Sequence, residues 1–173
     1  MRGTTLLFSG ALLIASCRKD RDTPASTPVA SPHCTPVSGF TPRDVQGALM
    51  ADPDTTDWRT REPWCPFVEG LFPARDGLHW SSEADSTELF AFPNPTEGSF
   101  MFNALRMNGY VDIRVVDMDG GLLHAVDSAM ASTFYFDLAG HGLHNGELVR
   151  VYYRMVGPDG AMVRGQGDIR YAP

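Results

Sequence analysis

The clearest structural signal in the chain is Val149-Arg150-Val151-Tyr152-Tyr153-Arg154-Met155. Apolar or aromatic side chains alternate here with arginines, and successive side chains of an extended chain point to opposite faces. The alternation predicts a β-strand with one face in a hydrophobic core and the other face toward water.

The same period of two recurs through the C-terminal half, from Glu88 onward. The positions expected to face the core in the other runs are Phe100, Phe102, Ala104, Val111, Ile113, Val115, Phe134, Phe136, Leu138, Ala161, Val163, Ile169 and Tyr171. Turn sequences separate the runs, namely Asp119-Gly120-Gly121, His144-Asn145-Gly146 and Gly157-Pro158-Asp159-Gly160. This spacing predicts an all-β fold: an antiparallel, Ig-like β-sandwich of about seven strands over residues 87–173.

Residues 40–86 form a second region with a different composition. Thr41-Pro42-Arg43-Asp44 combines an N-cap threonine, a proline at the first helical position and an acid in the first turn. This combination predicts a short helix ending near Met50. Residues 57–80 are rich in Trp, Phe and Pro and follow neither period. They form either an exposed recognition surface or an irregular segment that packs its aromatic side chains on the neighbouring domain.

The N-terminus has the pattern of an export signal over residues 1–16. Arg2 precedes a short apolar run, and small residues precede Cys17. Ile14-Ala15-Ser16-Cys17 resembles the lipobox of bacterial lipoproteins, which implies that Cys17 is acylated and that buried acyl chains hold the protein on a membrane. The alternative is an ordinary secretory signal with an incidental cysteine. Residues 17–39, rich in Pro, Ser, Thr and charge, are expected to be a disordered tether.

The cysteine count and the net charge indicate which compartment and which partners suit the chain. Once Cys17 is assigned to lipid, Cys34 and Cys65 are left as a pair that an oxidising compartment would join in a disulfide. The alternatives are two free thiols or a metal site, and the absence of a Cys-x-x-Cys or a His pair beside them disfavours the metal. The net charge of −7 disfavours nucleic acid as a partner.

Three sequence pieces in the C-terminal half resemble the type A sorting domain of type IX secretion cargo. They are Phe92-Pro93-Asn94-Pro95-Thr96-Glu97-Gly98, the run from Val111 to Asp117-Met118-Asp119-Gly120, and Phe136-Asp137-Leu138-Ala139-Gly140 followed by Gly146. The resemblance implies that the type IX secretion machinery is a partner and that Pro93, Asn94, Pro95, Gly98, Asp117, Gly120, Asp137, Leu138 and Gly146 are sorting-motif positions. The chain departs from the family at Glu147-Leu148 and in its non-basic C-terminus.

The resemblance leaves two readings of the C-terminal half. It is either a removable sorting signal on a secreted cargo or the retained body of a lipoprotein. The expected location is the cell envelope, lipid-anchored at the outer membrane and exposed at the surface, and Lys19-Asp20 resembles a signal for that outer face. The alternative location is secreted.

The chain has no sequence motif for catalysis. There is no Gly-x-Ser-x-Gly and no glycine-rich phosphate loop. His141 and His144 lie among glycines in an expected turn, and Asp117-Met118-Asp119-Gly120 lacks the further acids of a calcium loop. We therefore expect no catalytic residue, metal, cofactor or small-molecule substrate, and a non-catalytic protein. A small envelope enzyme is the remaining alternative.

Overall fold

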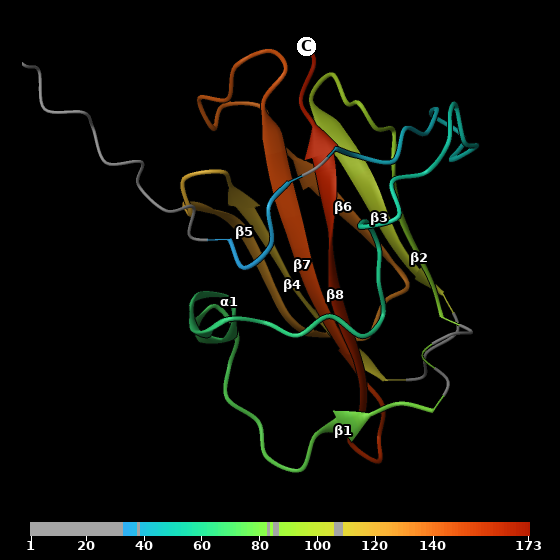
Figure 1. Cartoon of the computed structure of the whole chain (residues 1–173), viewed down its shortest axis with the longest axis vertical. Helices are drawn as coiled ribbons and strands as arrows, with labels where there is room; N and C mark the ends of the chain where they lie inside the picture. The colour runs from blue at the N-terminus through green and yellow to red at the C-terminus, as the bar shows by residue number, and fades with distance from the viewer. Residues whose placement is uncertain (1–32, 38, 83, 85–86, 106–108) are drawn as a thin grey trace, which may run out of the picture.

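The structure is a computed structural model that describes residues 33–37, 39–82, 84, 87–105 and 109–173. It is an all-β sandwich of two sheets with one short helix among the described residues (Figure 1). The smaller sheet has the order β2-β3-β6, made of Glu88–Phe92, Ser99–Leu105 and Thr133–Asp137. The larger has the order β1-β8-β7-β4-β5, made of His79–Trp80, Ala161–Arg170, Leu148–Val156, Tyr110–Asp117 and Leu122–Ala129. All pairings are antiparallel except that of β1 with β8.

The core between the two sheets follows the predicted alternation. The smaller sheet contributes Phe100, Phe102, Phe134 and Phe136, all nearly or fully buried, and the larger contributes Ile113, Val115, Val151, Tyr153 and Val163. Burial of these large apolar side chains is the main favourable term in the stability of the sandwich. The predicted fold class is confirmed.

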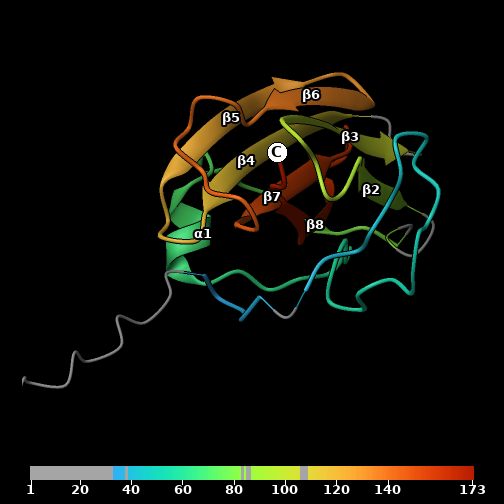
Figure 2. The same ribbon diagram turned by 90° about the horizontal axis from the view of Figure 1, so that it is seen from above.

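The outer face of the larger sheet is buried, contrary to the expectation that it faces water. Residues 33–37 and 39–81, which we call the cover segment, cross the outside of the larger sheet, pass beside β2 and β3 on the way, and end in the edge strand β1 (Figure 2). Trp64, Val68 and Phe72 of this segment pack on Val116 and Tyr152 of the sheet. The helix α1, Pro66–Gly70, supplies Val68 and begins with a proline at its first turn. The region 57–80 therefore packs its aromatic side chains on the sandwich.

The cover segment also reaches into the core and along the edge of β8. Gly165 and Gly167 have no side chains, and a Cβ at Gly167 would overlap the indole of Trp58. Trp58 fills this space and stacks on Tyr153 and Phe102, with ring centroids 6.2 and 5.8 Å apart. Its backbone N–H donates to the carbonyl of Gln166 at 2.7 Å. The free edge of β8 is thereby paired, which removes a site for unwanted strand pairing.

The predicted helix from Thr41 to about Met50 is wrong. The Asp44 carboxylate accepts hydrogen bonds from the N–H groups of Gln46 and Ala48, both at 2.9 Å, and so holds the chain in a turn. Gly47 has a φ of 83°, and Arg43 pairs with Leu49 across the turn. Local side-chain bonds thus outcompete the helix that the cap residues favour.

The predicted tether, residues 17–39, lies only partly within the described residues. Residues 17–32 lie outside the described residues. Residues 33–37, at the end of the predicted tether, are anchored on the sheet and not free, because His33 is buried there and Cys34 is in a disulfide. Within the described part of the chain, no helix has the length and apolarity to cross a membrane.

Candidate functional site

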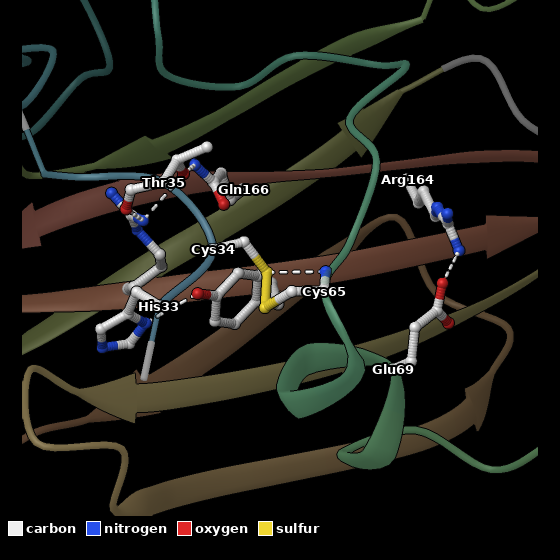
Figure 3. The surroundings of a disulfide bond; sticks show 9 residues. His33, Cys34, Thr35, Cys65, Glu69, Arg164 and Gln166 are labelled. Atoms are coloured by element: carbon white, nitrogen blue, oxygen red, sulfur yellow. Dashed lines mark hydrogen bonds and ion pairs between the residues drawn. A yellow bond between two sulfur atoms is a disulfide. The ribbon is translucent and has the colours of Figure 1, made fainter. Parts of the chain in front are cut away.

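Cys34 and Cys65 form a disulfide that fastens the start of the cover segment to the start of α1 (Figure 3). Their Cα atoms lie 5.4 Å apart, and the two residues are 31 positions apart in the sequence. The N–H of Cys65 also donates to the sulfur of Cys34 at 2.8 Å. The disulfide therefore closes a loop that contains most of the cover segment.

The residues beside the disulfide bind the polar outer face of the sheet. His33 Nδ1 lies 2.7 Å from the hydroxyl of Tyr152, and Nε2 lies 2.8 Å from the carbonyl of Asp117. The carbonyl can only accept, so Nε2 carries the proton and Nδ1 accepts from the tyrosine. Burial lowers the pKa of His33 and raises the pKa of Tyr152 to about 12. Both groups are therefore held neutral near pH 7.

A buried ion pair lies under the cover segment. The Arg150 guanidinium donates to both carboxylate oxygens of Asp168, at 2.7 and 2.8 Å, and both side chains are at most 2% exposed. Arg150 also donates to the carbonyl of Thr35 at 2.6 Å. A bidentate pair with its remaining donors satisfied offsets the cost of burying two charges.

Asp57 brings a second carboxylate from the cover segment to this pair. Its oxygens accept from the N–H of Thr41 at 2.7 Å and from the N–H of Asp168 at 2.9 Å. Burial, and then the charge of Asp168, raise the pKa of Asp57 to about 7. Because this pKa is close to neutral pH, the charge on the cover segment at Asp57 depends on pH.

Asp112 organises a second buried cluster further along the sheet. It is fully buried and accepts from Arg154 at 2.8 Å, from Arg75 at 3.1 Å and from the N–H of Ser128 at 2.8 Å. Burial alone would raise its pKa, but the bonds from Ser128, Arg154 and Arg75 outweigh burial and lower it. Arg75 belongs to the cover segment, so this cluster also binds the cover to the sheet.

The sorting-motif-like residues converge at one end of the sandwich, where β8 ends and β3 begins (Figure 1). Asn94 is fully buried there. Its amide nitrogen donates to the carbonyls of Thr41 at 3.1 Å and Asp168 at 2.8 Å, and its oxygen accepts from the N–H of Arg170 at 2.9 Å. Asn94 thus ties the smaller sheet to both the cover segment and β8. Pro93 and Pro95 flank it, each preceded by a cis peptide bond.

The other sorting-motif-like residues shape turns at the same end. Asp117 accepts from the N–H of Asp119 at 3.0 Å and of Gly121 at 2.6 Å, which closes the β4–β5 turn, and Gly120 has a φ of 92°. Asp137 accepts from the N–H of Ala139 at 2.8 Å, and Leu138 is buried in the core. Gly146, with a φ of 90°, donates to the carbonyl of Tyr171 at 2.8 Å.

A groove of about 690 Å³ opens on the outer face of the smaller sheet at this end. It is lined by Val45, Pro93, Pro95, Thr96, Glu97, Gly98, Ser99, Tyr135 and Asp137. Four of these are sorting-motif-like positions, and the sequence did not single out Val45 or Tyr135. The only sequence signal for Tyr135 is its outward place in the alternating run of β6.

Among the described residues, no group of three or more His, Cys, Asp and Glu side chains is arranged to hold a metal ion. The ring of His141 lies edge-on to that of His124, with centroids 4.9 Å apart. The N–H of His144 donates to the Glu147 carboxylate in the following turn. Cys17 lies outside the described residues.

Comparisons with known proteins give little further information. No protein-family model matches the chain, and no curated protein matches it. Among solved structures, the chain is similar to the crystal structure of CopC from Methylosinus trichosporium OB3b, with 18% identity over 50% of this chain and 94% of that chain. The TM-score is 0.36, and a likeness of this size carries no inference about this chain.

Proposed function

We propose that this chain is an exported, non-catalytic lipoprotein of the cell envelope, anchored through Cys17 and displaying its β-sandwich at the surface. The observation that carries the proposal is the cover segment. It begins at His33, and its side chains bury Val116 and Tyr152 completely. The region before residue 87 and the sandwich after it are therefore one folded unit.

This unity favours a retained body over a removable sorting signal. A cut between residues 86 and 87 would separate Arg75 and Asp57 from the buried charges of the sheet. It would also remove Trp58 from its place against Gly167. Exposing buried charges and a large apolar face is costly and promotes aggregation. A sorting domain that is removed by cleavage would instead need a polar surface of its own where residues before 87 had packed.

The disulfide supports the export part of the proposal. Disulfides persist in oxidising compartments and are rare in the cytosol.

The type IX secretion machinery is the partner that the sorting-motif-like residues suggest for crossing the outer membrane. Four of these residues, Pro93, Pro95, Gly98 and Asp137, line one groove that such machinery could contact, whereas Asn94 and Leu138 are buried. In this proposal the machinery exports the chain, and the end that it reads remains on the mature protein.

The test is the intact mass of the protein recovered from the cells that produce it, compared with that of a Cys17→Ser variant. The expected mass corresponds to residues 17–173 plus acyl chains, with the variant unacylated and released from the membrane fraction. A mass that lacks the region from about residue 87 onward would establish the removable signal and refute the retained body. An unacylated wild-type chain would refute the anchor.

A further inference from the structure

We infer that the groove at the C-terminal end of the sandwich binds a cationic side chain, arginine or lysine, presented by an extended segment of a partner protein. The inference goes beyond the proposed function and does not depend on the lipid anchor. It rests on the shape of the groove, on the charges at its rim and on one exposed aromatic ring.

The two sheets differ in how their outer faces are covered. The cover segment buries the outer face of the larger sheet, whereas the end of the smaller sheet is open where the groove lies. Tyr135 is 72% exposed and Val45 is 64% exposed, although both are large apolar or aromatic side chains. The groove opens on the outer face of β6, where Tyr135 and Asp137 line it.

The floor of the groove has room for a side chain. A Cβ placed on Gly98 would meet no heavy atom within 4 Å outside its chain neighbours. Pro93 and Pro95 form a rigid wall on the side of β2. A groove of about 690 Å³ is within the size range of small-molecule sites and is therefore large enough to admit one long side chain.

The rim of the groove selects for positive charge. Glu97 and Asp137 are both exposed there, and none of the described residues that line the groove is basic. His124 contacts the backbone carbonyl of Asp137, and the N–H of Ala139 is bonded to one carboxylate oxygen. Tyr135 precedes Asp137 by two residues on β6 and therefore lies on the same face. An aromatic face beside two carboxylates attracts a guanidinium or ammonium group.

Neutral sugars also stack on exposed aromatic rings and donate hydroxyl hydrogen bonds to carboxylates, but they carry no positive charge to match the two acids. The charge of the rim therefore favours a basic peptide segment over an oligosaccharide. The net charge of −7 for the whole chain further steers a basic partner toward the protein.

The test uses the full-length protein, as cells produce it, in a neutral detergent. The probe is a fluorescein-labelled octapeptide of alternating arginine and threonine, and binding is measured by fluorescence anisotropy. We expect binding that weakens as salt rises, because exposed charges are screened. The same peptide with glutamate in place of arginine is expected not to bind.

Variants separate the groove from the general acidity of the chain. Glu97→Gln and Asp137→Asn are each expected to weaken binding about two- to fivefold, the range for an exposed ion pair, and Asp137→Asn keeps the acceptor for Ala139. The matched control is Asp76→Asn with Asp159→Asn, which removes two charges at the opposite end of the sandwich and is expected to preserve most of the affinity.

A second pair of variants tests occupancy. Gly98→Phe fills the groove and is expected to abolish most binding, while Gly70→Phe, also in open space, is expected to leave it unchanged. Equal affinity for the two phenylalanine variants would overturn the inference. Equal losses of affinity from the Glu97→Gln/Asp137→Asn and Asp76→Asn/Asp159→Asn double variants would also overturn it. So would binding of an N-acetylglucosamine hexasaccharide in place of the arginine peptide.

Discussion

Removing the disulfide between Cys34 and Cys65 should detach the cover segment before it unfolds the sandwich. The closed loop spans 31 positions, and in the chain-entropy treatment a crosslink of this size stabilises the folded state by about 4 kcal/mol. This is a large part of the roughly 5–15 kcal/mol that separates folded from unfolded domains. The perturbation is the double variant Cys34→Ala/Cys65→Ala, which leaves no unpaired thiol at the site.

Tryptophan fluorescence is a direct reporter of the cover segment, because Trp58, Trp64 and Trp80 all lie within it and the chain contains three tryptophans. Urea titration of the double variant should show a loss of about 4 kcal/mol in the free energy of unfolding monitored by fluorescence. Circular dichroism, which follows the strands, should change at higher urea than fluorescence does. The wild type under reducing conditions is the matched comparison and should behave like the variant.

A double variant that loses less than about 1 kcal/mol, with both signals changing together, would refute this role of the disulfide. That result would mean that the buried charges and Trp58 hold the cover segment without the crosslink. It would also remove the disulfide as an argument for an oxidising compartment, because the bond would then contribute little to the fold.

Two further predictions concern the cover segment. Trp58→Ala should lower the free energy of unfolding by about 3 kcal/mol, since it leaves the space beside Gly167 empty, whereas Trp80→Ala, at a 38% exposed position, should cost less than about 1 kcal/mol in the same urea titration. The stability of the wild type should fall as pH rises from about 4 to about 7, because the pKa of Asp57 is raised by burial to about 7 and the folded state favours the protonated acid. Asp57→Asn should remove this decline, which is worth up to about 4 kcal/mol. The lowered pKa of His33 acts in the opposite direction below about pH 6.5, so the difference between wild type and variant is the measurement, and equal slopes would refute the role of Asp57.

The sequence predicted the core-facing positions of β3, β4, β6 and β7 well, whereas Ala161 of β8, also expected in the core, is only partly buried and lies outside it. A period of two assigns Val149, Val151, Tyr153 and Met155 to one face, and all four are buried between the sheets. The opposite face was predicted to be wet because Arg150 and Arg154 are charged. It is buried because each arginine meets an acid from another strand, Asp168 or Asp112, and such cross-strand partners depend on register. Alternation in one strand carries no information about register.

The cover segment was harder to predict for a different reason. The spacing of its apolar side chains matches the surface of the sheet and has neither a helical nor a strand period. Periodicity in the sequence therefore predicts no helix or strand there. The failed helix after Thr41 shows the same limit, because the cap signal is local while Asn94, far along the chain, fixes this turn by bonding to the carbonyl of Thr41. The groove is formed by three segments that are far apart in the sequence: Val45, residues 93–99, and Tyr135 with Asp137. Only the resemblance to the type A sorting domain had identified any of these residues as candidates.

The place of Trp58 against Gly167 of the last strand also constrains when the protein can fold. Trp58 pairs with Gln166, 108 positions later, so the cover segment cannot seat until almost the whole chain is present. Contacts of such long sequence separation slow folding, because the intervening chain must be closed first. A chain delivered through a membrane from its N-terminus would stay open during passage and would close only when its C-terminus arrives. Folding that is completed this late would keep an exported polypeptide unfolded, and able to cross a membrane, without another protein to hold it unfolded.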